Sequence, residues 1–134
     1  MIAKRWFKSS KFKKISDNSC SYLCDIFEKE VIIISTYIRS GSDGGCSEFG
    51  KLSRYILNLS EGRKDKLIIL GDFNAKIGIR EINEDDRTII GRSLFHNTSN
   101  PNGMELKNFM HSLRLKNYLT FSKSKSVEWT WTNG

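Results

Sequence analysis

Short apolar segments separated by polar turns are the main hydrophobic pattern in the first third of the chain. Residues 21–27 alternate between two sets of side chains, with Tyr22 and Cys24 on the same side. This period of two residues predicts a β-strand. Residues 31–38 are rich in β-branched side chains with little polarity on either side, which predicts a second strand buried on both faces. The polar segment at 28–30 predicts a turn, so the two strands are expected to form a hairpin.

Two later segments repeat their apolar residues at the spacing of an α-helix. The first follows a glycine-rich stretch at 40–45, which predicts a loop, and Ser47 is placed to cap the helix. The second follows Pro101, with Asn102 as the expected N-cap and Glu105 three residues later, as in a capping box. The repeating residues are Phe49, Leu52, Ile56 and Leu59 in the first helix, and Leu106, Phe109, Met110 and Leu113 in the second.

Three further short runs predict strands, and the order of elements predicts the fold class. Residues 67–70 are apolar on both faces and too few for a helix, which predicts a second central strand. Residues 118–121 and 127–131 predict two more strands, and the charged segment at 79–96 predicts a long polar loop. The order strand, strand, helix, strand, loop, helix, strand, strand is typical of one mixed α/β layered unit.

The charge of the chain is concentrated at its start. Lysine and arginine number 22 against 15 aspartate and glutamate residues, which gives a net charge of +7. Residues 1–14 hold six of the positive residues and no acid, and we interpret them as a basic N-terminal arm that either contacts phosphate or is simply solvated. Residues 15–134 are then expected to form the folded part of the chain.

Composition limits the class of protein and its compartment. The chain is 38% hydrophobic but has no apolar run of the roughly 18 to 20 residues that a membrane helix needs, so no membrane span is expected. Residues 1–14 lack the apolar core of a secretory signal, which favours an intracellular protein, nuclear or cytoplasmic, over a secreted one. The cysteines are therefore expected to be reduced, and Cys20 and Cys24 lie too far apart along one strand to form a disulfide.

The candidate chemistry lies where the strand at 67–70 runs into Gly71-Asp72-Phe73-Asn74. In an extended chain Asp72 and Asn74 point to the same side, while Phe73 points into the core. A carboxylate beside an amide can bind a divalent cation, or orient a water molecule and a phosphate oxygen for phosphodiester hydrolysis. The alternative is a strand-ending turn in which both side chains bond to their own backbone.

Three other segments accompany this one in a fixed order. Ile33-Ile-Ser-Thr-Tyr37 is a strand that ends in a tyrosine, Asn100-Pro-Asn-Gly103 opens a helix, and Trp129-Thr-Trp131 follows near the end. Together with Gly71-Asp-Phe-Asn-Ala-Lys-Ile-Gly78, they resemble the motifs of the endonuclease/exonuclease/phosphatase superfamily. The likeness covers about residues 13–134. It is strongest to retrotransposon-type endonucleases and craniofacial development protein 2-like proteins.

The resemblance implies a DNase I-like fold, a four-layer α/β sandwich with two sheets between helices, and a Mg²⁺-dependent endonuclease or phosphodiesterase that acts on nucleic acid, DNA more than RNA. It implies that Asp72 and Asn74 serve the metal and position the attacking water and the scissile phosphate, with Tyr37 beside that phosphate. Asn102 and Trp131 would contact the substrate. From the residues alone, Tyr37 and Trp131 can equally be core aromatics, and Asn102 only a helix cap.

The match to the superfamily is incomplete. Relatives usually place a proline where this chain has Arg39, which adds a candidate phosphate contact. The family also needs a metal-binding Glu on an upstream strand and a late Asp followed by Ser-Asp-His, and the chain shows neither. Its upstream acids lie in contexts unlike the family's Gln-Glu motif. His96 and His111 are expected to be structural or surface residues.

These observations predict a partial domain, with the N-terminal and C-terminal portions of the sandwich absent and little or no catalysis by the chain on its own. An incomplete sandwich exposes apolar sheet faces, so self-association is expected. Two alternatives remain open. One is a non-catalytic module that binds nucleic acid through its basic residues, and the other is a structural half-domain that needs a partner chain.

Overall fold

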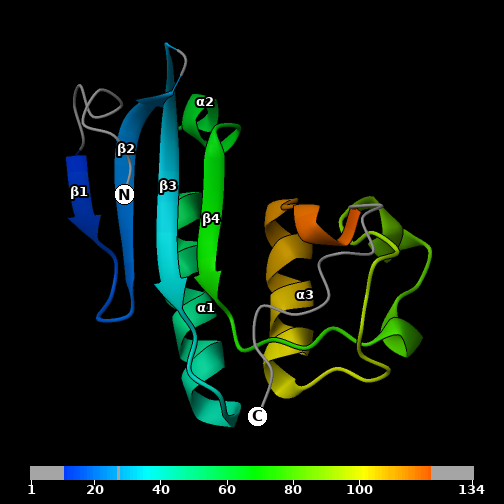
Figure 1. Cartoon of the computed structure of the whole chain (residues 1–134). Coiled ribbons are helices and arrows are strands. Elements are labelled where there is room, and N and C mark those ends of the chain that lie inside the picture. Colours follow the sequence, from blue (N-terminus) through cyan, green and yellow to red (C-terminus); the bar gives the residue numbers. More distant parts are fainter. Residues whose placement is uncertain (1–10, 27, 122–134) are drawn as a thin grey trace, which may run out of the picture.

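A four-stranded mixed sheet forms the centre of the chain (Figure 1). The computed structural model describes residues 11–26 and 28–121. The sheet has the order β1-β2-β3-β4, and its strands are β1 (Lys11–Lys14), β2 (Ser19–Ile26), β3 (Lys29–Tyr37) and β4 (Leu67–Asp72). Neighbours among β1, β2 and β3 are antiparallel, whereas β3 and β4 are parallel. The predicted α/β fold class is confirmed at this level.

The hairpin predicted from the first two apolar segments is present. β2 and β3 pair along their length, with Ser19 opposite Thr36 at one end. Glu28, in the turn between them, has a positive φ of 63°. The end of the basic N-terminal segment, Lys11–Lys14, forms β1 at the edge of the sheet and pairs with β2. β3 therefore lies in the interior of the sheet, as its apolar composition predicts.

The two faces of the sheet differ in what covers them. Ile32 and Ile34 of β3 are buried in the core under the first helix, α1 (Ser42–Leu57), which lies behind the sheet in Figure 1. The alternate residues of β3, ending in Tyr37, are half-buried or exposed on the opposite face. No helix of the described chain covers this opposite face, which we term the open face. The prediction that β3 is buried on both faces is therefore wrong, because burial also depends on the covering layer.

The helix after β3 begins earlier than the sequence predicts. α1 starts at Ser42, although the glycine-rich residues 40–45 predict a loop. The predicted cap, Ser47, consequently lies inside the helix, and Gly41 holds the N-cap position. A helical glycine costs about 1 kcal/mol relative to alanine, and the packing of α1 on the sheet outweighs that cost. A short helix, α2 (Glu61–Lys64), then leads into β4.

β4 is the edge strand of the described sheet, not a second central strand. Its register places Ile68 beside Ile33 and Leu70 beside Ser35 on the open face. Ile68 is 43% exposed and Leu70 is 55% exposed. Ile69 points the other way and packs on the core under α1. The position of this strand is thus predicted correctly, but its burial on both faces is not.

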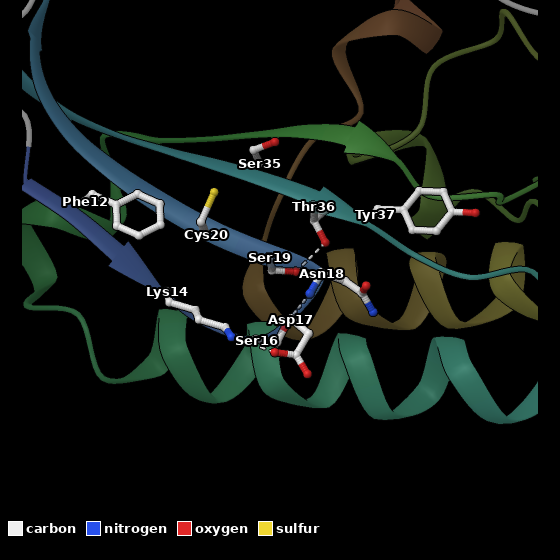
Figure 2. Close-up of a pocket in the computed structure, with 10 residues that line it drawn as sticks. All are labelled: Phe12, Lys14, Ser16, Asp17, Asn18, Ser19, Cys20, Ser35, Thr36 and Tyr37. Atoms are coloured by element: carbon white, nitrogen blue, oxygen red, sulfur yellow. Dashed lines mark hydrogen bonds and ion pairs between the residues drawn. The ribbon is translucent and has the colours of Figure 1, made fainter.

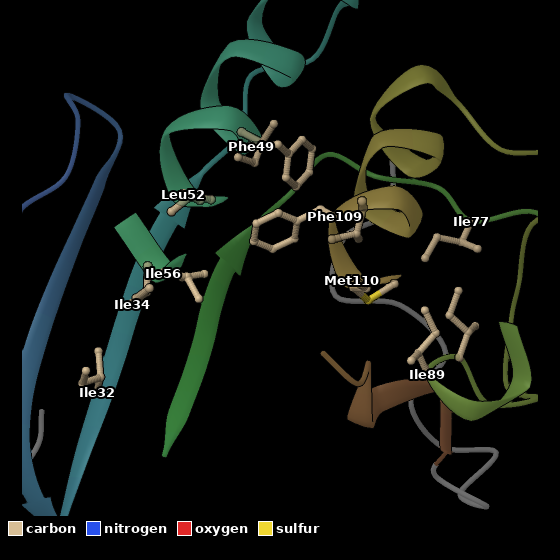
Figure 3. Close-up of a cluster of buried hydrophobic side chains, with 12 residues drawn as sticks. Ile32, Ile34, Phe49, Leu52, Ile56, Ile77, Ile89, Phe109 and Met110 are labelled. Carbon is tan, nitrogen blue, oxygen red and sulfur yellow. The ribbon is translucent and has the colours of Figure 1, made fainter. Parts of the chain in front are cut away.

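A further helix, α3 (Pro101–Leu113), packs beside α1 and carries the second predicted apolar stripe into the core (Figure 3). The ring centroids of Phe49 on α1 and Phe109 on α3 lie 5.3 Å apart. Phe49 also stacks on Phe73, with 6.3 Å between the ring centroids. Phe73 is therefore directed into the core, as the sequence predicts. Figure 3 shows the same core continuing past Phe109 to Ile77.

The N-cap of α3 differs from the prediction by two residues. The side chain of Asn100 caps the helix, because its Oδ1 accepts a hydrogen bond from the backbone N–H of Gly103 at 2.8 Å. Asn102, the predicted cap, lies in the first turn and is only 3% exposed. Both asparagines flank Pro101 and both are good capping residues, so the sequence alone does not separate them.

The charged segment before α3 is folded onto that helix. It contains two short 3₁₀ helices, η2 (Ile79–Glu81) and η3 (Asp85–Thr88), and buries Ile90 completely. Asp86 of η3 is also buried, and its carboxylate lies 2.5 Å from Nε2 of His111 on α3. The prediction of an extended excursion without a regular strand or long helix is confirmed.

The chain after α3 turns where the sequence predicts a strand. Residues Tyr118–Phe121 form a 3₁₀ helix, η4. Oγ1 of Thr120 donates a hydrogen bond to the carbonyl of Asn117 and accepts one from the N–H of Gly91, each at 2.7 Å. Such local bonds favour a turn over a strand. The predicted strand at 127–131 lies outside the described residues. Within those residues, no helix is long and apolar enough to cross a membrane.

Candidate functional site

Two of the predicted catalytic residues meet at the carboxyl ends of β3 and β4. These strands are parallel, and Tyr37 pairs in register with Asp72. Residues that pair in register point to the same face of a sheet, so both side chains lie on the open face at one edge of the fold. Tyr37 is 48% exposed, and Asp72 is exposed as well. Ligands of α/β sheets commonly bind at such carboxyl ends.

Asn74 belongs to a turn and does not continue the strand. β4 ends at Asp72, and Asn74 has a φ of 46°, in the left-handed region. The backbone N–H of Asn74 donates to Oδ1 of Asp72 at 2.9 Å. Its side-chain Nδ2 donates to the carbonyl of Ile38 at 2.8 Å. The predicted extended arrangement of Asp72 and Asn74 is thus wrong, and the alternative of a strand-ending turn describes the geometry.

The turn nevertheless ties the ends of two strands together. Ile38 directly follows Tyr37, so the amide of Asn74 links the end of β4 to the end of β3. The backbone N–H of Ile38 also donates to the carbonyl of Asp72 at 2.8 Å. These bonds hold the three residues predicted to be catalytic within one small region at the edge of the sheet.

Asn102 fastens this region to α3. Its Nδ2 donates to the carbonyl of Arg39 at 2.9 Å and to the carbonyl of Phe73 at 3.1 Å. One buried amide therefore holds the backbone of the segment after β3 and the backbone of the segment after β4. With this bonding Asn102 is a positioning residue in the structure. The side chain of Arg39 extends from the same tied segment and is exposed.

Asn100, which the sequence analysis does not single out, holds the next part of the turn. Its Nδ2 donates to the carbonyl of Asn74 at 2.9 Å, and its Oδ1 accepts from the N–H of Lys76 at 2.9 Å. The same Oδ1 caps α3 through Gly103. An Asn-Pro pair at a helix start is the signal that could have identified Asn100, because proline favours the first helical position after a capping side chain.

Two glycines allow the close packing of this region. A Cβ atom on Gly71, whose φ is 150°, would lie 1.8 Å from the carbonyl oxygen of Thr36 on β3. A Cβ atom on Gly103 would lie 1.8 Å from the carbonyl oxygen of Lys76. The glycine that precedes Asp72 is thus required by the strand pairing that sets Asp72 beside Tyr37.

The described residues offer an incomplete ligand set for a divalent cation. Mg²⁺ in proteins is often held by one or two carboxylates, with water and substrate phosphate oxygens completing its coordination. Asp72 supplies one exposed carboxylate, with one of its oxygens already bonded to the N–H of Asn74. Among residues 11–26 and 28–121, no group of three His, Cys, Asp or Glu side chains gathers to hold a metal ion. Trp131, a predicted substrate contact, lies outside those residues.

A shallow groove adjoins Tyr37 on the side of β1 and β2 (Figure 2). It has a volume of about 450 Å³. The aromatic ring of Phe12 lies on one side of the groove and that of Tyr37 on the other, with the small side chains of Cys20 and Ser35 between them. The remaining lining residues are Lys14, Ser16, Asp17, Asn18, Ser19 and Thr36.

A buried carboxylate lies beneath this groove. Glu48 of α1 is 3% exposed and accepts hydrogen bonds from the hydroxyl of Ser16 and, at 2.7 Å, from that of Ser19. Ser19 in turn lies 2.6 Å from Oγ1 of Thr36 on β3. Burial acts to raise the pKa of Glu48, but the serine hydrogen bonds and nearby Lys51 outweigh burial and hold that pKa below its ordinary value. The network joins the β1–β2 turn to α1 and β3.

A second buried carboxylate stabilises the far side of α3. Asp86 accepts hydrogen bonds from the N–H of Asn83 at 2.9 Å and from Nζ of Lys107 at 3.3 Å, beside its contact with His111. Burial acts to raise the pKa of Asp86, and these partners outweigh it and lower the pKa. His111 therefore pairs with a structural carboxylate, which agrees with its expected structural role.

Comparison with known proteins does not assign the chain to a family. It matches no protein-family model, no curated protein and no solved structure.

Proposed function

We propose that the chain is part of a phosphodiesterase domain of the endonuclease/exonuclease/phosphatase type, which handles a phosphate at the joined ends of β3 and β4. The pairing of Tyr37 with Asp72 carries the proposal. An acid and a phenol from separate segments meet there on one exposed edge. Asn74 and Asn102 tie the same strand ends by hydrogen bonds. Sequence motifs that are dispersed along the chain are thus adjacent in the fold.

Each side chain has a role in the proposed reaction. The carboxylate of Asp72 orients an attacking water and serves a divalent cation, and the hydroxyl of Tyr37 donates a hydrogen bond to a phosphate oxygen. Asn74 and Asn102 hold the strand ends in place. Mg²⁺, when bound, would neutralise charge on the phosphate. Arg39, beside the same edge, supplies a positive charge for the phosphate.

The proposal includes an incomplete DNase I-like sandwich of low activity. The exposed apolar side chains of Ile68 and Leu70 on the open face support a missing second sheet. A divalent ion and a general base each contribute several kcal/mol to such reactions, and about 1.4 kcal/mol is tenfold in rate. A site with one carboxylate is therefore expected to turn over little or no substrate by itself.

The test has one readout for the site and another for activity. Mn²⁺ broadens the NMR signals of nearby amides, so titration with Mn²⁺ should selectively broaden those of Tyr37, Asp72 and Asn74. The effect should be lost in Asp72→Ala and retained in Asp65→Ala, which removes an exposed carboxylate from the turn before β4. Broadening that is absent, lies elsewhere, or survives Asp72→Ala would contradict the site.

A plasmid-nicking assay with Mg²⁺ tests activity in the same proteins. We expect no cleavage above the background of an EDTA control. Nicking that disappears in Asp72→Ala would confirm the site and contradict the low activity. Nicking that persists undiminished in Asp72→Ala would overturn the assignment of Asp72.

A non-catalytic nucleic-acid-binding module is the second candidate, and β1 favours it. Lys11, Lys13 and Lys14 lie together at the edge of the sheet, although Lys14 forms an ion pair with Asp17 at 2.6 Å. Replacement of Lys11 and Lys13 by glutamine should then weaken DNA binding and reduce its salt dependence. The folded sheet should be retained, because both side chains are exposed. Unchanged affinity and salt slope would discard this candidate.

A further inference from the structure

The open face of the sheet is apolar at its centre. Its register rows run Phe12, Tyr22, Ile33 and Ile68, and then Lys14, Cys20, Ser35 and Leu70. Between the outer strands this face carries no charged residue along these rows. Leu70 and Ile68 are among the large apolar side chains most accessible on the sheet, and the exposed ring of Phe12 packs edge-on against Tyr22. Contiguous apolar patches of this kind mark interaction surfaces.

We propose that the open face is the interface of a symmetric dimer, in which a second copy of this chain docks its own open face against it. The two copies then form four layers in the order helix, sheet, sheet, helix, with the sheets about 10 Å apart. The proposal rests on the uncovered sheet and does not depend on the phosphate site.

The charges at the edges of the open face favour a second copy. Lys14 lies on β1 at one edge, and Asp72 lies on β4 at the other. A two-fold axis that runs along the strands between β2 and β3 places β1 of each copy over β4 of its partner. Positive and negative edges then face each other on both sides of an uncharged centre. The surface is thus complementary to itself, as a two-fold interface requires.

The same charges disfavour nucleic acid on this face. Binding to a phosphate backbone depends on several lysine or arginine side chains. The rows of the open face hold Lys14 alone, and its ammonium group is already paired with Asp17. Lys11 and Lys13 alternate with Phe12 and Lys14 along β1 and point to the opposite side. Nucleic acid would therefore bind at the β1 edge and leave the apolar centre uncovered.

The size of the face suits a dimer of moderate affinity. Strands as long as β2 and β3 extend about 26 to 30 Å, and four strands about 4.8 Å apart span about 19 Å, which gives a projected area of about 500 Å². Side chains roughen the surface, so its accessible area approaches the roughly 800 Å² per partner of a stable interface. We therefore expect association in the micromolar range, with dissociation on dilution.

Sedimentation of the full chain over a range of concentrations tests the dimer. The mass should rise from 15.4 kDa to twice that value and no further. Leu70→Arg should weaken association at least about tenfold, because it buries two unpaired charges in each dimer. Met104→Arg changes an equally exposed side chain on α3, away from the sheet, and should leave association unchanged. High salt should preserve the dimer, since apolar contacts persist where phosphate contacts are lost.

A cross-linking experiment covers the case in which Leu70→Arg does not fold. Cys20 is half-buried near the centre of the open face, so a short bismaleimide should join it to its counterpart in the partner. The experiment uses a chain in which Cys24 and Cys46 are replaced by alanine. The control adds Cys20→Ala and Arg54→Cys, which moves the only thiol to the exposed side of α1 and should prevent cross-linking.

Several results would overturn the proposal. They are a monomer at all concentrations, a mass that grows beyond two copies, or equal dimerisation of Leu70→Arg and Met104→Arg. Cross-linking at position 54 that equals that at Cys20 would do the same. A dimer that disappears in high salt or on nuclease treatment would assign the association to bound nucleic acid instead.

Discussion

Asn102 shows how much of the site depends on one amide. Its Nδ2 bonds the carbonyls of Arg39 and Phe73, which belong to segments that are separated by α1, α2 and β4. A buried carbonyl that loses its partner costs free energy, because water cannot replace the lost bond there. The geometry at the ends of β3 and β4 therefore depends on a residue that follows them in the chain.

Replacement of Asn102 by alanine should lower the free energy of unfolding by about 1 to 3 kcal/mol. Two backbone carbonyls lose a buried donor, and the packing of α3 against the strand ends is weakened. Urea unfolding followed by circular dichroism measures the change. Asn108→Ala is the matched control, because Asn108 is exposed on the same helix, and it should change stability by less than about 0.5 kcal/mol. Equal losses in the two variants would show that Asn102 has no special role.

Asp86 should stabilise the protein more than any neighbouring acid. Asp86→Ala removes an almost fully buried acceptor from Asn83, Lys107 and His111, and should cost about 2 to 4 kcal/mol. Asp85→Ala is the control, since Asp85 is the adjacent exposed acid. Urea unfolding at neutral pH should separate the two variants. A loss for Asp86→Ala no larger than that for Asp85→Ala would contradict the structure.

The residues of the site differ in how well the sequence predicts them. The adjacency of Tyr37 and Asp72 follows from two apolar strands that end in polar residues, since parallel neighbours end at the same edge. The conformation of Asn74 does not follow, because a left-handed φ is local and most asparagines do not adopt it. Asn100 and Asn102 exchange their expected roles, because both suit a helix start and tertiary contacts decide between them.

At the scale of elements, the pairing of β3 with β4 controls the site. The strands approach so closely at Gly71 that its missing side chain is part of the pairing. Gly71→Ala would force a Cβ atom into the carbonyl of Thr36 on the neighbouring strand. The two strands would have to separate at the level of Tyr37 and Asp72.

We expect Gly71→Ala to destabilise the protein by about 2 kcal/mol or more, through a steric clash at a positive φ. Gly50→Ala should do the opposite. Gly50 lies within α1 with no neighbouring atom near its Cβ position, so alanine there should add about 0.5 to 1 kcal/mol of stability. Thermal unfolding of both variants tests the pair. A stable Gly71→Ala protein would contradict the close approach of the strands.

Elements were more predictable than their surroundings. Strands β2, β3 and β4 and helix α3 follow from apolar patterns long enough to define a period. The early start of α1 does not, because two glycines lower its local helix propensity and only packing on the sheet compensates. The turn η4 replaces a predicted strand because Thr120 bonds locally to Asn117. The open face of β3 and β4 is not readable from composition, since an apolar strand looks the same whether or not a layer covers it.

For the whole molecule, the two buried carboxylates determine the response to acid. Glu48 and Asp86 join different parts of the chain, and both have pKa values lowered in the folded state from ordinary values of 4.5 and 3.8. The unfolded chain therefore binds protons at a higher pH than the folded one. Their contribution to stability is fully present above those ordinary values and is lost as the pH falls through the lowered folded values.

The melting temperature should accordingly be nearly constant between pH 6 and about pH 5 and fall steeply below about pH 4. Glu48→Gln should be less stable than the wild type near neutral pH, and the difference should shrink in acid because the wild-type carboxylate is then protonated as well. Calorimetry over this pH range measures both effects. A difference that stays constant down to pH 3 would show that ionised Glu48 does not contribute to stability.

The parallel pairing of β3 and β4 has a consequence for the speed of folding. The β2–β3 hairpin is local and can form within about 1 to 10 μs, whereas β4 reaches β3 only after the intervening chain has closed a long loop and formed α1. The rate-limiting step should therefore be the arrival of β4, and mutations in β4 should slow folding more than mutations at the β1 edge. Until that step, the unpaired edge of β3 is open to any extended chain nearby, so molecules that emerge together from synthesis have a brief interval in which to pair wrongly.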